Sequence, residues 1–165
     1  MNRFCATITI LVFLMGCQTS SSNEDDANLT QAQEIYSDAM DIHDEVMPRM
    51  GELMQLRRAV ETQIDSLNQL DSVAYADTVQ YMQHIVDNLR YADRGMMQWM
   101  RNVKKVPGLE EEGQSEFQDK ISIEEADTTN VVQVQKSQKT VIEQVKQQIE
   151  SSIEEAKAVL GIEGV

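Results

Sequence analysis

Residues 40–54 read MDIHDEVMPRMGELM, and they form the centre of the apolar pattern that decides the fold. Across residues 35–70, apolar side chains recur at a three-then-four spacing, which places them on one face of an α-helix. This stripe contains Ala39, Ile42, Val46, Leu53, Leu56, Val60, Leu67 and Leu70. A second stripe beside it contains Met40, His43, Met47, Met50 and Met54. The pattern predicts a long first helix, over about residues 29–70, against which the rest of the chain packs.

Pro48 lies inside this predicted helix. Proline removes one backbone hydrogen bond and disfavours helical geometry at the preceding residue, Met47. The apolar stripe keeps its phase on both sides of Pro48, so we expect a kink in the helix and not a break.

Two further helices are expected downstream. The second spans about residues 73–106, after a turn around Asn68–Ser72, and its seam consists of Tyr75, Val79, Met82, Val86, Leu89, Met96, Met100 and Val103. Pro107-Gly108 ends it, and residues 107–127 read as an acidic loop. The third spans about residues 128–160 and closes at Gly161 and Gly164. Its seam consists of Val131, Val134, Gln138, Val141 or Ile142, Val145, Ile149, Ile153, Ala156 and Leu160.

Three long helices predict an all-α fold, an antiparallel bundle with up-down-up topology. A helical hairpin with a separate coiled-coil third helix is the alternative. The chain has 28 acidic and 14 basic residues, a net charge of −14. This charge argues against nucleic acid as a partner, because phosphate binding needs clustered Lys and Arg.

The first residues have the features of a secretion signal. Arg3 precedes an apolar run from Phe4 to Met15 that is too short to span a bilayer. The run closes with Leu14-Met15-Gly16-Cys17, which resembles the lipobox of bacterial lipoproteins. The resemblance implies a signal peptide over residues 1–16 and acylation of Cys17, for example with palmitate. Residues 17–28 are then expected to be a polar tether.

The residue after the lipidated cysteine bears on location. Gln18 resembles the pattern of lipoproteins sorted to the outer membrane, facing the periplasm. The acidic Glu24-Asp25-Asp26 leaves display on the cell surface open as an alternative.

Methionines gather in two separate stretches of the chain. If the first two helices form a hairpin that turns near Asp71, Met47 lies level with Met96, Met50 lies near Asp93, and His43 lies near Met100. Thioether and imidazole groups suit copper(I), and the nearby Trp99 could cover a bound cation. Residues His43 to Met54 span about 16 Å of helix, so one ion could use only part of the set. The candidate ligands are His43, Met47, Met50, Met96 and Met100, for copper(I) or silver. Core packing is the simpler interpretation, because methionine is an adaptable core residue.

Two further resemblances involve short motifs. His43 to Gly51 and Met96-Met97-Gln98-Trp99-Met100 look like paired motifs of small bacterial envelope lipoproteins often labelled "viral A-type inclusion protein". That family has no assigned activity, so the resemblance implies helices and a lipid anchor. Leu29-Thr30-Gln31-Ala32-Gln33 resembles a motif of periplasmic stress chaperones related to spheroplast protein. Thr30 with Gln33 also has the form of a capping box, which predicts a helix start near Leu29.

Motifs of the common catalytic sites are absent from the sequence. It contains no Glu-x-x-His pair, no His-Glu-x-x-His, no phosphate-binding glycine loop and no Gly-x-Ser-x-Gly. We therefore expect no enzyme, but an envelope protein that acts by binding or scaffolding, through a protein partner or by self-association of its helices. Copper(I) binding and chaperone-like client binding are the alternatives.

Overall fold

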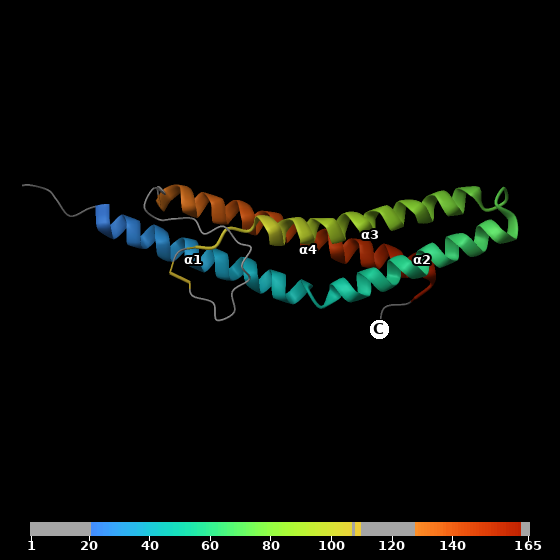
Figure 1. Ribbon diagram of the computed structural model, residues 1–165, viewed down its shortest axis with the longest axis horizontal. Helices are drawn as coiled ribbons and strands as arrows, with labels where there is room; N and C mark the ends of the chain where they lie inside the picture. The colour runs from blue at the N-terminus through green and yellow to red at the C-terminus, as the bar shows by residue number, and fades with distance from the viewer. Residues whose placement is uncertain (1–20, 107, 110–127, 163–165) are drawn as a thin grey trace, which may run out of the picture.

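The computed structural model describes residues 21–106, 108–109 and 128–162, which form four helices and no strand. The helices are α1 (Ser21–Val46), α2 (Arg49–Asp71), α3 (Ala76–Asn102) and α4 (Thr128–Leu160), arranged as an elongated rod (Figure 1). The signal peptide, Cys17, most of the acidic loop and Gly164 lie outside the described residues.

The topology is the predicted up-down-up bundle. Residue numbers rise together in the contacts Asp38–Lys139 and Glu45–Lys146, so α1 and α4 run parallel. The chain reverses between α2 and α3, so α3 runs antiparallel to both. Because α4 packs against all three other helices, it is an integral part of the bundle and not a separate coiled-coil helix.

The first helix begins earlier than expected. α1 starts at Ser21, so residues 21–28, predicted to belong to the tether, are helical. The predicted cap at Thr30 is wrong. Its hydroxyl donates a 2.9 Å hydrogen bond to the carbonyl of Asp26, four residues earlier, which is a bond made inside a helix.

Pro48 interrupts the helix more strongly than the predicted kink. α1 ends at Val46, Met47 and Pro48 form a turn, and α2 begins at Arg49. The amide of Met50 bonds to the carbonyl of Met47 at 3.1 Å, a tighter turn than an α-helical one. The apolar stripe nevertheless stays in phase, with Val46 and Leu53 both buried. The result is a bend at which both halves keep the same face toward the core (Figure 1).

Asp71 shapes the turn between α2 and α3. Its carboxylate accepts hydrogen bonds from the amides of Val73 and Ala74, at 3.0 and 2.9 Å. α3 therefore begins at Ala76, three residues after the predicted start. Tyr75 is 38% exposed, so its predicted place in the seam is wrong. Leu70, at the end of the first predicted stripe, is also exposed.

α3 ends at Asn102 and not at residue 106, because side chains of α4 form hydrogen bonds with the backbone that follows. The side chain of Gln138 accepts a 2.7 Å hydrogen bond from the amide of Lys104. The buried Gln135 donates a 2.9 Å bond to the carbonyl of Lys104. These bonds hold the segment after Asn102 against α4, with Val103 in an extended conformation and both Val103 and Val106 buried. Gly108 follows in a left-handed conformation, with φ of 81°.

α4 is the longest of the described helices, and most of its predicted seam is buried. Val131, Ile142, Val145, Ile149, Ile153 and Ala156 of its predicted seam are buried. The prediction left open whether Val141 or Ile142 belongs to the seam. Ile142 does, since it is buried and Val141 is 42% exposed. Gly161, with φ of 68°, ends the helix, and the amide of Ile162 bonds to the carbonyl of Lys157 as in a Schellman cap.

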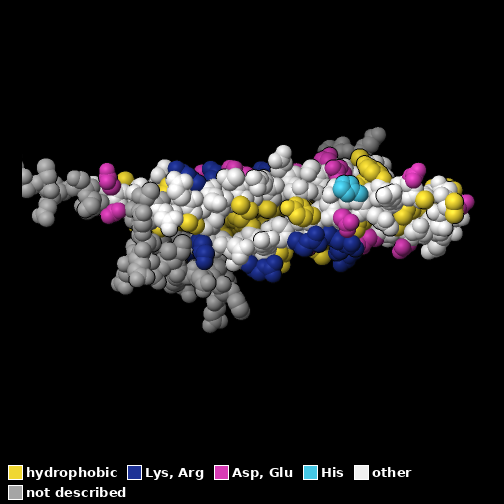
Figure 2. All heavy atoms as spheres, turned by 90° about the horizontal axis from the view of Figure 1, so that it is seen from above, with side chains coloured by type: hydrophobic (Ala, Val, Ile, Leu, Met, Phe, Trp, Pro, Cys, Tyr) yellow, Lys and Arg dark blue, Asp and Glu magenta, His cyan; other side chains and the backbone are white. Residues whose placement is uncertain are grey.

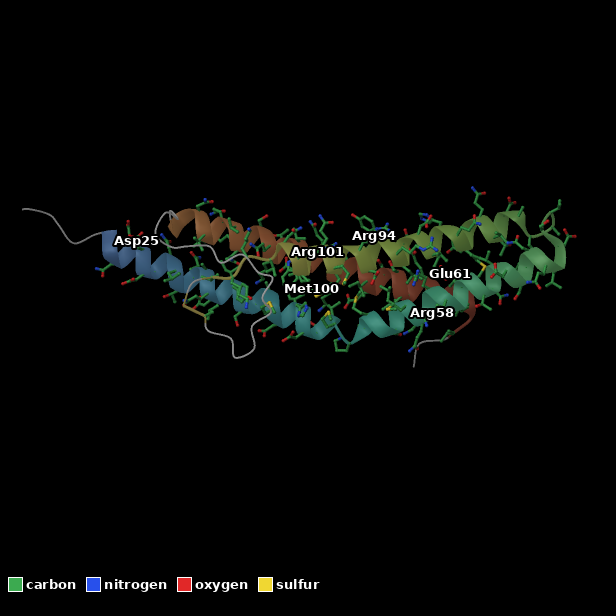
Figure 3. The ribbon with its side chains drawn as sticks, in the orientation of Figure 1. Asp25, Arg58, Glu61, Arg94, Met100 and Arg101 are labelled. Atoms are coloured by element: carbon green, nitrogen blue, oxygen red, sulfur yellow. The ribbon has the colours of Figure 1, made fainter. Side chains whose placement is uncertain are left out.

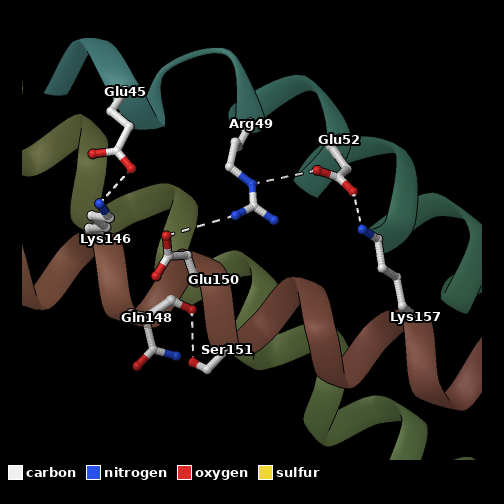
Figure 4. Close-up of polar contacts among 8 residues, drawn as sticks. All are labelled: Glu45, Arg49, Glu52, Lys146, Gln148, Glu150, Ser151 and Lys157. Carbon is white, nitrogen blue, oxygen red and sulfur yellow. Dashed lines mark hydrogen bonds and ion pairs between the residues drawn. The ribbon is translucent and has the colours of Figure 1, made fainter. Parts of the chain in front are cut away.

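Ion pairs connect α4 with both α1 and α2 (Figure 4). On α1, Glu45 accepts a 2.6 Å bond from Lys146. On α2, Glu52 lies 2.7 Å from the ammonium of Lys157. Arg49 lies between them, 3.7 Å from Glu52 and 3.8 Å from Glu150. This row of charges crosses the Pro48 turn, so α4 joins α1 to α2.

The hydrogen bond from Lys157 lowers the pKa of Glu52 below its ordinary value of 4.5. We expect Glu52→Gln to lower the free energy of unfolding at pH 7 by at most about 1 kcal/mol, since the pair is partly exposed. A carboxyl group with a lowered folded-state pKa stabilises above pH 4.5, and its contribution disappears as pH falls through the folded-state value. The difference between variant and wild type should therefore vanish at low pH.

Urea unfolding followed by circular dichroism, at pH 7 and at pH 3, measures this difference. Glu34→Gln is the matched control, because Glu34 is exposed on α1. An equal effect of Glu52→Gln at both pH values would contradict the assignment of the ion pair.

Candidate functional site

His43 and Trp99 form the centre of the Met-rich band, which we define as Met40, His43, Met47, Met50, Met96, Met97, Trp99 and Met100. Their rings stack with centroids 5.6 Å apart and planes inclined by 26°. His43 lies on α1, just before the Pro48 turn, and Trp99 lies in the last turns of α3. The two stretches therefore meet at the level of the bundle that the sequence predicted.

Trp99 is fixed from the other side by α4. Its ring is 4% exposed, and its indole N–H donates a 3.0 Å hydrogen bond to the backbone carbonyl of Gln138. The same Gln138 holds the amide of Lys104 through its side chain. One residue of α4 thus positions both the indole and the segment after α3.

The methionines of the band occupy different environments. Met96 is fully buried in the core, whereas Met50 and Met100 are half-buried against it. Met47 is 36% exposed at the turn, and Met97 is 49% exposed. Figure 3 shows Met100 on the side of α3 that faces the junction of α1 and α2. The structure thus brings His43 to Trp99 and distributes the candidate sulfur ligands between core and surface.

The imidazole of His43 has one nitrogen next to an acid. Its Nδ1 lies 2.9 Å from a carboxylate oxygen of Asp44. A proton on Nδ1 makes this contact a hydrogen bond and leaves the Nε2 lone pair as a metal ligand. In the part of the chain that the structure describes, no three His, Cys, Asp or Glu side chains converge as a metal site. A metal ion at this band would depend on thioether ligands.

A groove between α3 and α4 is the second candidate site, and the sequence analysis missed it. It has a volume of about 690 Å³, within the range of ligand sites. None of the described residues that line it is charged. Its amide and hydroxyl groups come from Tyr91, Gln98, Asn102, Ser137, Gln138, Gln144, Gln147, Gln148 and Ser151.

The sequence does contain a signal for this groove. Ser137, Val141, Gln144, Gln148 and Ser151 repeat at alternating spacings of four and three, and Tyr91, Gly95, Gln98 and Asn102 do the same on α3. This spacing places each set on one helix face. The faces are uncharged and mostly polar, so they do not stand out as a hydrophobic stripe.

Comparison with protein-family models, with curated proteins and with solved structures finds no match for this chain. Among the described residues, no helix is long and apolar enough to cross a membrane.

Replacing Trp99 with Phe keeps an aromatic ring and removes the hydrogen bond to Gln138. We expect the free energy of unfolding to fall by about 1–3 kcal/mol, since a partly buried carbonyl loses one partner and the smaller ring leaves a gap. Urea unfolding followed by circular dichroism at 222 nm provides the measurement. Tyr81→Phe, at an exposed tyrosine of the same helix outside the groove, should change it by less than about 0.5 kcal/mol. Equal losses in both variants would contradict the anchoring role of Trp99.

Proposed function

We propose that this protein is a lipid-anchored envelope protein that acts by binding or scaffolding and not by catalysis. The lipid is attached to Cys17 and holds the chain at the outer membrane, facing the periplasm. The observation that carries the proposal is the length of the rod. α1 and α2, of 26 and 23 residues, follow one another and together extend about 70 Å from the N-terminal end.

The far end of the rod supports a binding role. α4 ends at Leu160, and the α2–α3 hairpin continues past it as a pair of helices (Figure 1). At the tip Leu70 is 74% exposed, Val73 85% and Tyr75 38%. Apolar side chains that face solvent together are typical of a contact site for another protein. The start of α1 at Ser21 and the apolar tip lie at opposite ends of the described rod, so a lipid on Cys17 would leave the tip far from the membrane.

A photoreactive amino acid at Val73 of the full-length protein in cells tests this arrangement. We expect it to cross-link another envelope protein, because the tip is exposed and apolar. The same amino acid at Gln63, exposed on the side of α2, should give at least several-fold less product.

The lipid is tested in the same cells by Cys17→Ser. This variant should lose the palmitate label and leave the membrane fraction while keeping its helical circular dichroism. A tip that gives no adduct above the Gln63 control would contradict the binding role. Retention of Cys17→Ser in the membrane fraction would contradict the anchor.

Copper(I) binding at the Met-rich band is the second candidate function. The contact of His43 Nδ1 with Asp44 favours it, because histidine ligands of metals commonly donate their other N–H to a carboxylate. Met50 and Met100 are half-buried, and we expect their thioether groups to be the sulfur ligands. The ring of Trp99 covers the imidazole of His43.

A titration of residues 18–165 with copper(I), against a competing chelator, tests this function. We expect one ion bound with a Kd below micromolar, and loss of binding in His43→Ala. His84→Ala is the control, since His84 is exposed elsewhere on α3. Weak binding that is equal in both variants would contradict a copper(I) site and would mean that the Met-rich band serves only in packing.

A further inference from the structure

The α3–α4 groove differs in charge from the rest of the chain. The protein carries a net charge of −14, whereas the described lining of the groove contains no charged residue. Figure 2, which looks down on α3 and α4, shows uncharged and hydrophobic side chains along the middle of this face. Two strongly acidic copies of the chain repel each other least where their facing surfaces are uncharged. The composition of the groove therefore permits contact between copies.

The polar groups of the groove are complementary to themselves. An amide side chain such as Gln98 or Gln144 has both a donor and an acceptor, and so does the hydroxyl of Ser137. A surface of such groups can pair with an identical surface, as a two-fold symmetric contact requires. A surface of like charges cannot. The regular three-and-four spacing on both helices is also the spacing of helices that pack against one another.

The two rims of the groove differ in charge. On α3, Arg94 and Arg101 follow the lining residues Tyr91 and Gln98 by three positions, so they lie beside them on the outer flank. The acid on this flank, Asp87, pairs with Arg90 at 3.5 Å, so the bases outnumber the acid there. In Figure 2, the larger groups of Lys and Arg side chains lie along one long edge of this face, with Asp and Glu beside them, and smaller groups lie along the opposite edge.

The α4 rim is more acidic. Glu154 follows Ser151 by three positions, and Glu143 precedes Gln147 by four, so both lie beside the α4 lining. Lys136 lies on the same flank, so the acids outnumber the base there.

We propose that this groove is a homodimer interface, in which α3 of each copy packs over α4 of the second copy. A two-fold axis parallel to the helices brings the basic rim of one copy against the acidic rim of the other. An axis perpendicular to the helices would instead place α3 over α3 and oppose like charges. The rims therefore select the parallel arrangement, in which both N-terminal ends lie at the same end of the dimer.

This dimer deepens the proposed scaffold role but does not depend on the lipid. Parallel copies direct both anchors toward one membrane and both hairpin tips away from it. A chain that leaves the membrane when Cys17 is replaced should still dimerise, so failure of the anchor and failure of the dimer are distinguishable.

Directed disulfide formation between two full-length copies tests the geometry. Gly95 lies level with Val145, since a Cβ built on Gly95 would be 3.4 Å from that side chain. Gln98 of one copy should therefore lie over Gln144 of the second copy. Differently tagged chains with Gln98→Cys and with Gln144→Cys are co-expressed, and non-reducing gels are compared with wild type, which contains Cys5 and Cys17.

We expect a mixed disulfide dimer from the Gln98→Cys and Gln144→Cys pair, and none above wild type from Gln55→Cys with Gln144→Cys. Gln55 is exposed on α2 and serves as the matched control. A self-linked Gln98→Cys dimer without the mixed product would overturn the parallel arrangement. Absence of any product above wild type would overturn the dimer and leave the groove to a helix of another protein.

Reversal of the rim charges provides an independent test. Arg94→Glu with Arg101→Glu should lower the mixed-disulfide yield about fivefold, because like charges then face each other. Adding Glu143→Arg and Glu154→Arg to the same chain should restore the yield. All variants must retain the helical circular dichroism of the wild type. An unchanged yield after the first reversal, or no recovery after the second, would contradict the rim pairing.

Discussion

The packing of α4 across the Pro48 turn is the contact on which the rest of the structure depends. α1 and α2 are separate helices, and the turn between them contributes little to holding them in line. α4, at 33 residues, lies along both and buries Ile142, Ile149 and Ile153 against the bundle. Its ion pairs with Glu45 and Glu52 lie on either side of the turn. The rod is continuous because a second helix bridges the place where the first is interrupted.

The same helix organises both candidate sites. Through Gln138, α4 fixes the indole of Trp99, which in turn stacks on His43 of α1. α4 also forms one wall of the uncharged groove, whose lining includes Gln138 itself. A single element therefore presents an apolar face to the core, a charged flank to α1 and α2, and an amide-rich flank to solvent. Binding at either site would depend on how firmly α4 is docked.

Apolar periodicity predicted the class of fold and most of the core, since it depends on residues close in sequence. Combined with the expected hairpin, it also predicted that His43 lies at the level of Trp99 in the bundle. Apolar periodicity did not predict where α3 ends, because side chains distant in sequence replace the backbone bonds of the helix there. The partners of Lys104, Gln135 and Gln138, lie more than 30 positions away. The prediction that Tyr75 belongs to the buried seam was wrong because the carboxylate of Asp71 shapes the turn before α3. The groove was missed because a polar stripe reveals no site until the neighbouring helix is known.

The parallel pairing of α1 with α4 also determines the order in which the protein can fold. Its hydrogen-bonded ion pairs join residues 101 positions apart, whereas α2 and α3 are joined by a short turn. Local contacts form before contacts that close long loops. The α2–α3 hairpin can therefore form while the chain is still emerging. Apart from the stacking of His43 on Trp99 of α3, α1 makes its long-range contacts mainly with α4, the last helix to be made. A newly made chain must thus keep α1, with its buried Ala32, Tyr36 and Ala39, uncovered until synthesis is almost complete.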